Sequence, residues 1–173
     1  VAYRIDLGAP GSAEALARWV TETHPECSVL VNNAAIMHHL DLTRESVTRL
    51  AAIDAEISTN VTAPLQLAVA MLPVLRTHPS AAIVNVTSGL AIAPKRDAAV
   101  YCATKAALRN FTRSLRDQCR ASGLPIQVSE DRILVAMADP GNVFAIDEIR
   151  SRTGKRVEPI EVDEVELRNA IEQ

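Results

Sequence analysis

The sequence has few of the features on which small disulfide-rich, zinc-binding or nucleic-acid-binding proteins depend. Its three cysteines, Cys27, Cys102 and Cys119, are widely spaced and form no Cys-x-x-Cys pair, which argues against a disulfide framework or a zinc site. The formal net charge is −3, with no cluster of basic and aromatic residues, which argues against nucleic-acid or acidic-membrane partners. No apolar run approaches the roughly 20 residues that span a bilayer. We therefore expect a cytoplasmic protein with neither kind of partner.

The composition fits one ordinary folded core. The chain has 173 residues, of which 48% are hydrophobic and 23% are charged, and these values exclude a disordered or fibrous protein. Residue 1 is valine and the sequence enters an apolar run at once. We therefore expect the chain to begin partway through a gene product.

Apolar runs alternate with helical periodicity along most of the chain. Runs at residues 1–5, 28–31 and 81–86 predict strands, and periodic apolar positions predict helices from an N-cap at Ser12 to His24, from about 45 to 75, and from 101 to 121. Such alternation needs crossover connections and predicts an α/β fold with a parallel sheet.

The polar residues that end the predicted strands are the first candidates for a site. They are Asp6, Asn32-Asn33 and Thr87-Ser88. Ligands of open parallel sheets bind beyond the carboxyl ends of the strands. Asn and Ser also end strands because they favour turns, but three such endings in one sheet favour a binding site.

Tyr101 and Lys105 lie one helical turn apart, so their side chains share one face of the predicted helix. A nearby cation favours the phenolate and lowers the pKa of a phenol, which makes the pair a tunable acid/base. Simple surface packing explains many Tyr-x-x-x-Lys patterns, but the position of this one after a strand ending in Ser88 favours chemistry.

Pro64 has no N–H, so the carbonyl of Asn60 loses its intrahelical partner and becomes available to water. The alternative is a proline tolerated at a bend. His38-His39 suggests a metal pair, but adjacent histidines point differently and no third ligand is evident. We predict exposed loop histidines and no metal site.

Four motifs together resemble the short-chain dehydrogenase/reductase family. They are Asn32-Asn33-Ala34-Ala35, Asn60, Ser88 and Tyr101-Cys-Ala-Thr-Lys105. Longer matches at 60–64, 86–91 and 101–108 resemble the subgroup described as oxidoreductases associated with D-alanine export. The resemblance implies a partial doubly wound, Rossmann-like parallel sheet without its N-terminal strands, with a catalytic domain at residues 1–145 and a charged, peripheral, mainly helical tail at 146–173.

The resemblance also assigns roles to residues. Tyr101 would be the general acid/base, Lys105 would lower its pKa and hold the ribose, Ser88 would polarise the carbonyl and Asn60 would support a proton relay. The NAD or NADP cofactor would be bound by Asp6 at the adenine, by Asn33, Ala34 and Ala35 along the backbone, by Tyr101 and Lys105, and by Pro140, Gly141 and Val143.

These roles imply hydride transfer between nicotinamide and a carbonyl or alcohol substrate. No glycine-rich phosphate loop precedes the first predicted strand, so a second interpretation stays open. It is a catalytically silent fragment that acts as an interaction module, docking as a homo-oligomer through the two long helices. After residue 128 two alternatives also remain, an insertion before Pro140-Gly141 or a true strand at Ile133 to Met137.

Overall fold

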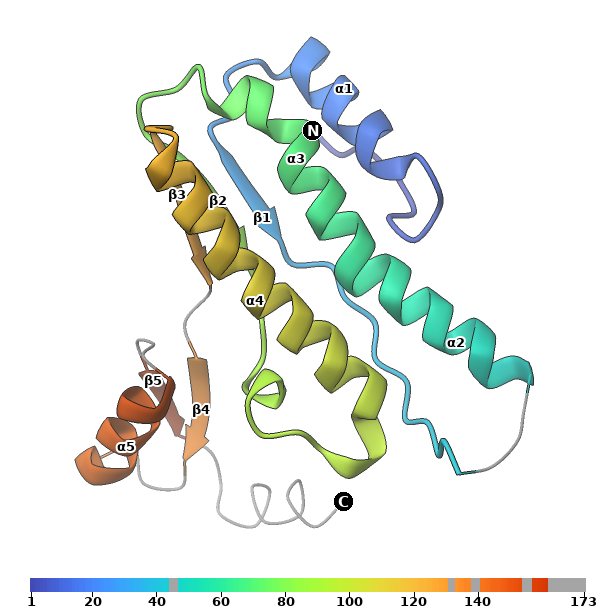
Figure 1. The fold of residues 1–173 in the computed structure, drawn as a ribbon, viewed down its shortest axis with the longest axis vertical. Coiled ribbons are helices and arrows are strands. Elements are labelled where there is room, and N and C mark those ends of the chain that lie inside the picture. Colours follow the sequence, from blue (N-terminus) through green and yellow to red (C-terminus); the bar gives the residue numbers. More distant parts are fainter. Residues whose placement is uncertain (44–46, 131–132, 138–140, 154–156, 162–173) are drawn as a thin grey trace. The chain divides into compact units, whose positions relative to one another are not determined.

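A three-stranded parallel sheet organises the first of two units, Val1–Asp131 (Figure 1). In the computed structural model, which describes residues 1–43, 47–130, 133–137, 141–153 and 157–161, its strands are β1 (Val29–Asn32), β2 (Ala81–Asn85) and β3 (Ile126–Glu130). β1 aligns Val29 with Ala82, and β2 aligns Ala81 with Ile126. The predicted α/β fold with a parallel sheet is therefore confirmed.

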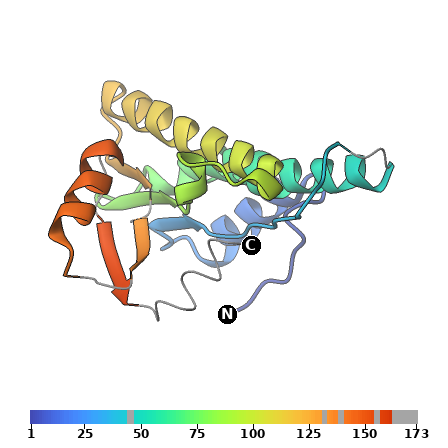
Figure 2. The same cartoon turned by 90° about the horizontal axis from the view of Figure 1, so that it is seen from below.

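Helices α3 and α4 cover one face of this sheet (Figures 1 and 2). The helices of the unit are α1 (Ser12–Thr23), α2 (Val47–Ile57), α3 (Ala63–Leu75) and α4 (Ala99–Ala121), with a π-helical turn, η1, at Ser58–Thr62. Short 3₁₀ turns, η2 and η3, occupy Gly89–Ala91 and Arg96–Ala98. α1 packs on α3. The core lies between these helices and the sheet and includes Ala68, Leu75, Ile83, Leu115 and Val128.

The strand predicted at residues 1–5 is wrong, because these residues form no strand. The ring of Tyr3 stacks on Trp19 of α1, with 4.6 Å between centroids, so the segment packs on a helix instead of entering a ladder. Within the residues that the structure describes, β1 pairs with β2 alone, and its Val29 and Val31 are 48% and 54% exposed. β1 is thus an apolar edge strand.

The helix start predicted at Ser12 is displaced by one residue. Gly11, with φ of 76°, is the N-cap of α1, and glycine adopts this left-handed conformation without steric cost. Ser12 is the first helical residue, and its buried hydroxyl donates to the carbonyl of Leu7 at 3.1 Å. Its side chain therefore anchors the preceding turn and does not cap the helix.

The long helix predicted at about 45–75 is interrupted by the π turn η1, in which the N–H of Ala63 reaches back five residues to the carbonyl of Ser58. Pro64 follows at once, and its missing N–H explains why the α-helical ladder is broken there. The stretch Arg49–Leu75 is long and apolar enough to cross a membrane by length and composition alone. Leu67, Ala68, Met71 and Leu75 are buried in the core, and we interpret α3 as a core helix.

The second unit, Arg132–Gln173, contains β4 (Ile133–Met137), α5 (Val143–Thr153) and β5 (Val157–Glu161). β4 and β5 pair in parallel, Ile133 opposite Val157. Ile133–Met137 is thus a strand of a separate sheet, while β3 is the strand that pairs with β2.

The sequence predicted a helical tail from residue 146, which is wrong at Val157–Glu161 because these residues form strand β5. Helix α5 returns the chain so that β5 pairs with β4 in parallel, which makes a strand–helix–strand unit. The first unit ends at residue 131 and the second begins at residue 132, whereas the sequence predicted a boundary after 145. The rest of the predicted tail, residues 162–173, lies outside the described residues.

Candidate active site

Polar side chains gather where β1 and β2 end, because the carboxyl ends of parallel strands share one edge of the sheet. Asn32, the last residue of β1, is buried and donates to Asn85 Oδ1 at 2.8 Å and to the Pro64 carbonyl at 3.4 Å. Asn85, the last residue of β2, donates to Thr112 Oγ1 at 2.9 Å. This chain of amides ties β1 to β2, α3 and α4, so the strand ends are held rigidly.

Ser88, Tyr101 and Lys105 meet beyond the end of β2. Ser88 precedes η2, and its Oγ accepts a hydrogen bond from Leu90 N at 3.1 Å. Tyr101 is half-buried in the first turn of α4, and the Ser88 side chain is one of the groups that act on the pKa of its hydroxyl. Lys105 is 2% exposed, with its Nζ 5.6 Å from the centroid of the Tyr101 ring. The sequence prediction that these three side chains lie together therefore agrees with the geometry.

The pKa of Tyr101 shifts in the direction opposite to the one predicted. Burial raises it, the hydrogen bond with Ser88 acts the other way, and the charges of Cys102 and Glu56 raise it further. Lys105 donates from Nζ to the Val86 carbonyl at 2.9 Å, and burial lowers its own pKa. The ammonium is thus bound to a backbone carbonyl, and the phenol favours its neutral form.

Asn60 joins the loop after β1 to the helix that carries Tyr101. It lies in η1 and is 1% exposed. Its Oδ1 accepts from Ile36 N at 2.8 Å, and its Nδ2 donates to Ile36 O at 2.7 Å and to Thr104 Oγ1 at 3.2 Å. Thr104 in turn donates to the Tyr101 carbonyl at 2.8 Å. The sequence drew attention to the main-chain carbonyl of Asn60 and missed this side-chain role.

Two exposed segments lie near the end of β1. Asn33, Ala34 and Ala35 are exposed, and Asp6 accepts a hydrogen bond from Gly8 N at 2.9 Å in a tight turn. Leu7 of that turn lines a cavity of about 130 Å³ together with Asn33 and Ala34. The turn and the loop are therefore neighbours, as a shared binding role requires.

The remaining predicted cofactor residues belong to the second unit or lie outside the described residues. Val143 begins α5 and is 61% exposed, and its N–H donates to the Gly141 carbonyl at 2.8 Å. Pro140 lies outside the described residues. The cofactor roles of these three residues stay predictions.

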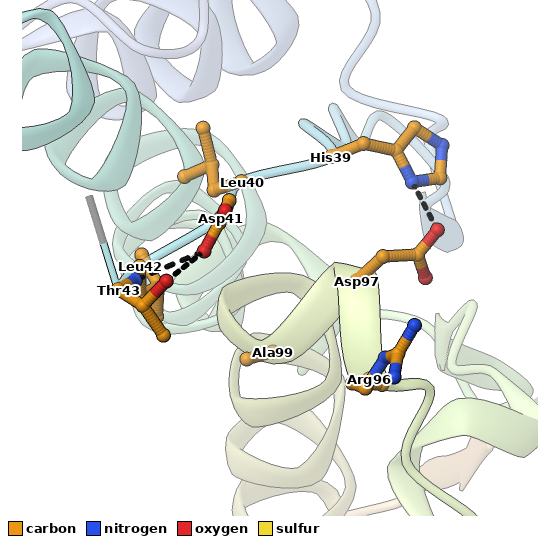
Figure 3. Close-up of a pocket in the computed structure, with 8 residues that line it drawn as sticks. All are labelled: His39, Leu40, Asp41, Leu42, Thr43, Arg96, Asp97 and Ala99. Carbon is orange, nitrogen blue, oxygen red and sulfur yellow. Dashed lines mark hydrogen bonds and ion pairs between the residues drawn. The ribbon is translucent and has the colours of Figure 1, made fainter.

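A larger cavity of about 590 Å³ lies between the loop after β1 and the start of α4 (Figure 3). In Figure 3 the ring of His39 points to Asp97, with Nδ1 3.2 Å from Oδ2, and Arg96 lies beside them. Ala99, two residues before Tyr101, also lines it. Among the residues that were searched, no three His, Cys, Asp or Glu side chains gather as metal ligands.

Of the two histidines predicted to be exposed, His39 is exposed and His38 is half-buried. The side chain of His38 is 41% exposed and that of His39 is 54% exposed, and each contacts a carboxylate. Sequence reasoning missed both pairs, because Glu56 and Asp97 are far from the histidines along the chain.

Comparisons with known proteins agree with this arrangement. The family model described as short chain dehydrogenase matches residues 1–143. The uncharacterized oxidoreductase DltE of Bacillus subtilis is 40% identical over 121 residues, which cover 70% of this chain and 48% of that protein. The chain therefore spans about half the length of this curated relative.

Solved structures show the same fold. A metagenomic short-chain oxidoreductase in complex with NADP superposes with a TM-score of 0.68 at 24% identity, over 93% of this chain and 72% of its own. A short-chain dehydrogenase from Sphingobium yanoikuyae in complex with NADPH gives 0.64 at 21% identity, over 96% and 70%. With the family match across most of the sequence, the chain belongs to the short-chain dehydrogenase family.

Proposed function

We propose that the chain carries the acid/base centre of an NAD(P)-dependent oxidoreductase that interconverts a carbonyl and an alcohol. The observation that carries the proposal is the meeting of Ser88, Tyr101 and Lys105 beyond the end of β2, with Lys105 Nζ 5.6 Å from the centroid of the Tyr101 ring and Ser88 acting on the Tyr101 hydroxyl. A phenol beside a hydroxyl can share one substrate oxygen with it. That is the arrangement that acid/base chemistry at a carbonyl needs.

The residues near the end of β1 fit a nicotinamide cofactor. Asn33, Ala34 and Ala35 present an exposed backbone beyond the strand end, where dinucleotides bind in such sheets, and the Asp6 turn lies beside them. We propose that these residues and Lys105 hold NADP or NAD. When bound, the cofactor supplies or accepts the hydride.

The protein's own groups handle the substrate oxygen and its proton. In the reducing direction the Tyr101 hydroxyl donates a proton to the carbonyl oxygen, while the Ser88 hydroxyl donates a hydrogen bond to the same oxygen. The raised pKa of Tyr101 keeps the hydroxyl protonated at neutral pH, which suits an acid. Asn60 acts through the hydrogen bonds that fix the loop after β1 against α4.

A second candidate is an interaction module without catalysis. It is favoured by the large apolar side chains exposed on the helical stretch 47–75, where Leu50 is 63% exposed and Val69 is 60% exposed. Exposed apolar side chains suit a protein contact. In that case Tyr101 would be dispensable.

Turnover separates the two candidates. We would follow oxidation of NADPH and NADH by absorbance with a panel of ketones and aldehydes, using both this chain and the full product of its gene. We expect Tyr101→Phe to lower kcat/KM by about 100-fold or more, the usual share of a general acid. Tyr3→Phe is the matched control, because Tyr3 packs on Trp19 away from these groups. Equal turnover by Tyr101→Phe and the parent would reject the acid/base role.

A further inference from the structure

A buried carboxyl group in α2 takes no part in the chemistry proposed above. Glu56 is 0% exposed, and its Oε2 is buried and has no hydrogen-bond partner in the part of the chain that the structure describes. Burying an unpaired polar oxygen is costly, and an apolar side chain of similar size would fill the same space without that cost. Packing alone therefore does not account for a glutamate at this position.

The second oxygen of Glu56 contacts the loop after β1 at two points. Oε1 accepts a hydrogen bond from His38 N at 2.6 Å and lies 3.0 Å from His38 Nδ1. The main chain and the ring of His38 thus share one partner, which belongs to a side chain that water does not reach. A hydrogen bond shielded in this way has no water competing for the donor.

Asn60, four residues after Glu56 along the same helical stretch, binds the loop two residues before His38. Its Oδ1 accepts from Ile36 N at 2.8 Å, and its Nδ2 donates to Ile36 O at 2.7 Å. One helical turn rises about 5.4 Å, and two residues of an extended chain span about 6.6 Å, so the two side chains match alternate N–H groups of an extended segment. Met37, between them, is 44% exposed, as that alternation requires. Glu56 and Asn60 together therefore clamp the segment as a neighbouring strand would.

The residues proposed to line the cofactor come directly before this clamp. Residues 33–35 are exposed. Asn32 before them is tied to Asn85 by a hydrogen bond of 2.8 Å, and Ile36 after them begins the clamped segment. A short segment held at both ends loses less conformational freedom when a ligand binds, which strengthens binding.

We propose that Glu56 is a positioning residue that, through His38, holds the loop after β1 in the shape that receives the nicotinamide cofactor. Glu56 acts through the loop and not on the reacting atoms. Its role in cofactor binding rests on the proposed function, whereas its hold on the loop is a property of the folded chain and needs no cofactor.

Hydrogen exchange of single main-chain amides, followed by NMR in this chain, tests the hold on the loop. We expect Glu56→Met to speed the exchange of His38 N–H by about fivefold or more, because its acceptor is removed. Glu56→Gln keeps an oxygen acceptor and should stay closer to the parent. The N–H of Ile83 in the central strand β2 should exchange at the parent rate, which separates a local release of the loop from a general loss of stability.

Asp54→Asn is the matched control, because it removes an exposed carboxylate from the same helix, and it should leave the exchange of His38 N–H unchanged. Circular dichroism would confirm that each variant is folded, and Glu56→Leu replaces Glu56→Met should the latter unfold. Unchanged exchange of His38 N–H in a folded apolar variant, or equal acceleration in Asp54→Asn, would overturn the proposal.

Steady-state kinetics of the full product of the gene test the consequence for the cofactor. We expect Glu56→Met to raise KM for NADPH or NADH by about fivefold, with kcat changed by less than about twofold. A variant that only lost folded protein would lower kcat at constant KM, and that result would overturn the positioning role. Faster exchange of His38 N–H in a chain whose parent full-length protein neither binds cofactor nor turns over would uphold the hold of Glu56 on the loop and reject the oxidoreductase function instead.

Discussion

Replacing Asn60 by alanine should strongly destabilise the first unit. The side chain makes three hydrogen bonds, two with Ile36 and one with Thr104. At about 1 kcal/mol net for each bond, and with the buried partners left unsatisfied, we expect Asn60→Ala to lower the free energy of unfolding by about 3 kcal/mol. That is a large part of the roughly 5–15 kcal/mol of a whole domain.

Urea denaturation followed by the fluorescence of Trp19, the single tryptophan, measures this loss. Asn110→Ala is the control, because it makes the same substitution at an exposed position of α4. A double-mutant cycle with Thr104→Val isolates the contact between α4 and η1, for which we expect a coupling of about 1 kcal/mol. A loss in Asn60→Ala no greater than in Asn110→Ala would refute the reasoning.

Two further predictions follow from burial near the site. The pKa of Tyr101 is raised above its ordinary 10.0, so the native state holds this proton more tightly than the unfolded state. The resulting stability is complete below pH 10 and is lost as the pH rises through the folded pKa. Tyr101→Phe should therefore make the urea midpoint fall less steeply at alkaline pH. Cys102 and Cys119 are buried while Cys27 is half-buried, and burial also raises the pKa of Cys119. A thiol reagent should therefore modify one cysteine quickly in the native protein, and Cys27→Ser should abolish that fast phase.

The features predictable from sequence are those with a local cause. Buried strands of a parallel sheet are continuously apolar, as at residues 81–84, and the helical spacing of Tyr101 and Lys105 fixes their common face. The polar strand ends predicted the edge of the sheet at which Ser88, Tyr101 and Lys105 lie together. Each of these patterns is complete within a few residues, so no knowledge of the fold was needed to read it.

The features missed depend on contacts between distant residues. The contact of His38 with Glu56 and the hydrogen bond from Ile36 N to Asn60 Oδ1 join segments that only the fold brings together. The predicted direction of the Tyr101 pKa shift was wrong for the same reason. Spacing alone placed an ammonium near the phenol, but it could not show that Lys105 is hydrogen-bonded to Val86 while burial and Glu56 act on Tyr101.

The π turn at Ser58–Thr62 explains how one helical stretch serves both the core and the site. Before the turn, Glu56 faces the loop at His38, and within it Asn60 faces the same loop at Ile36. After it, Pro64 offers its carbonyl to Asn32, while the rest of α3 packs into the core. A π turn adds a residue and so rotates the helix after it relative to the helix before it. That rotation allows the polar face of α2 to face the loop after β1 while the apolar face of α3 faces the core. Pro64 has no N–H, so the α-helical hydrogen bond cannot form at this position and the break is permanent.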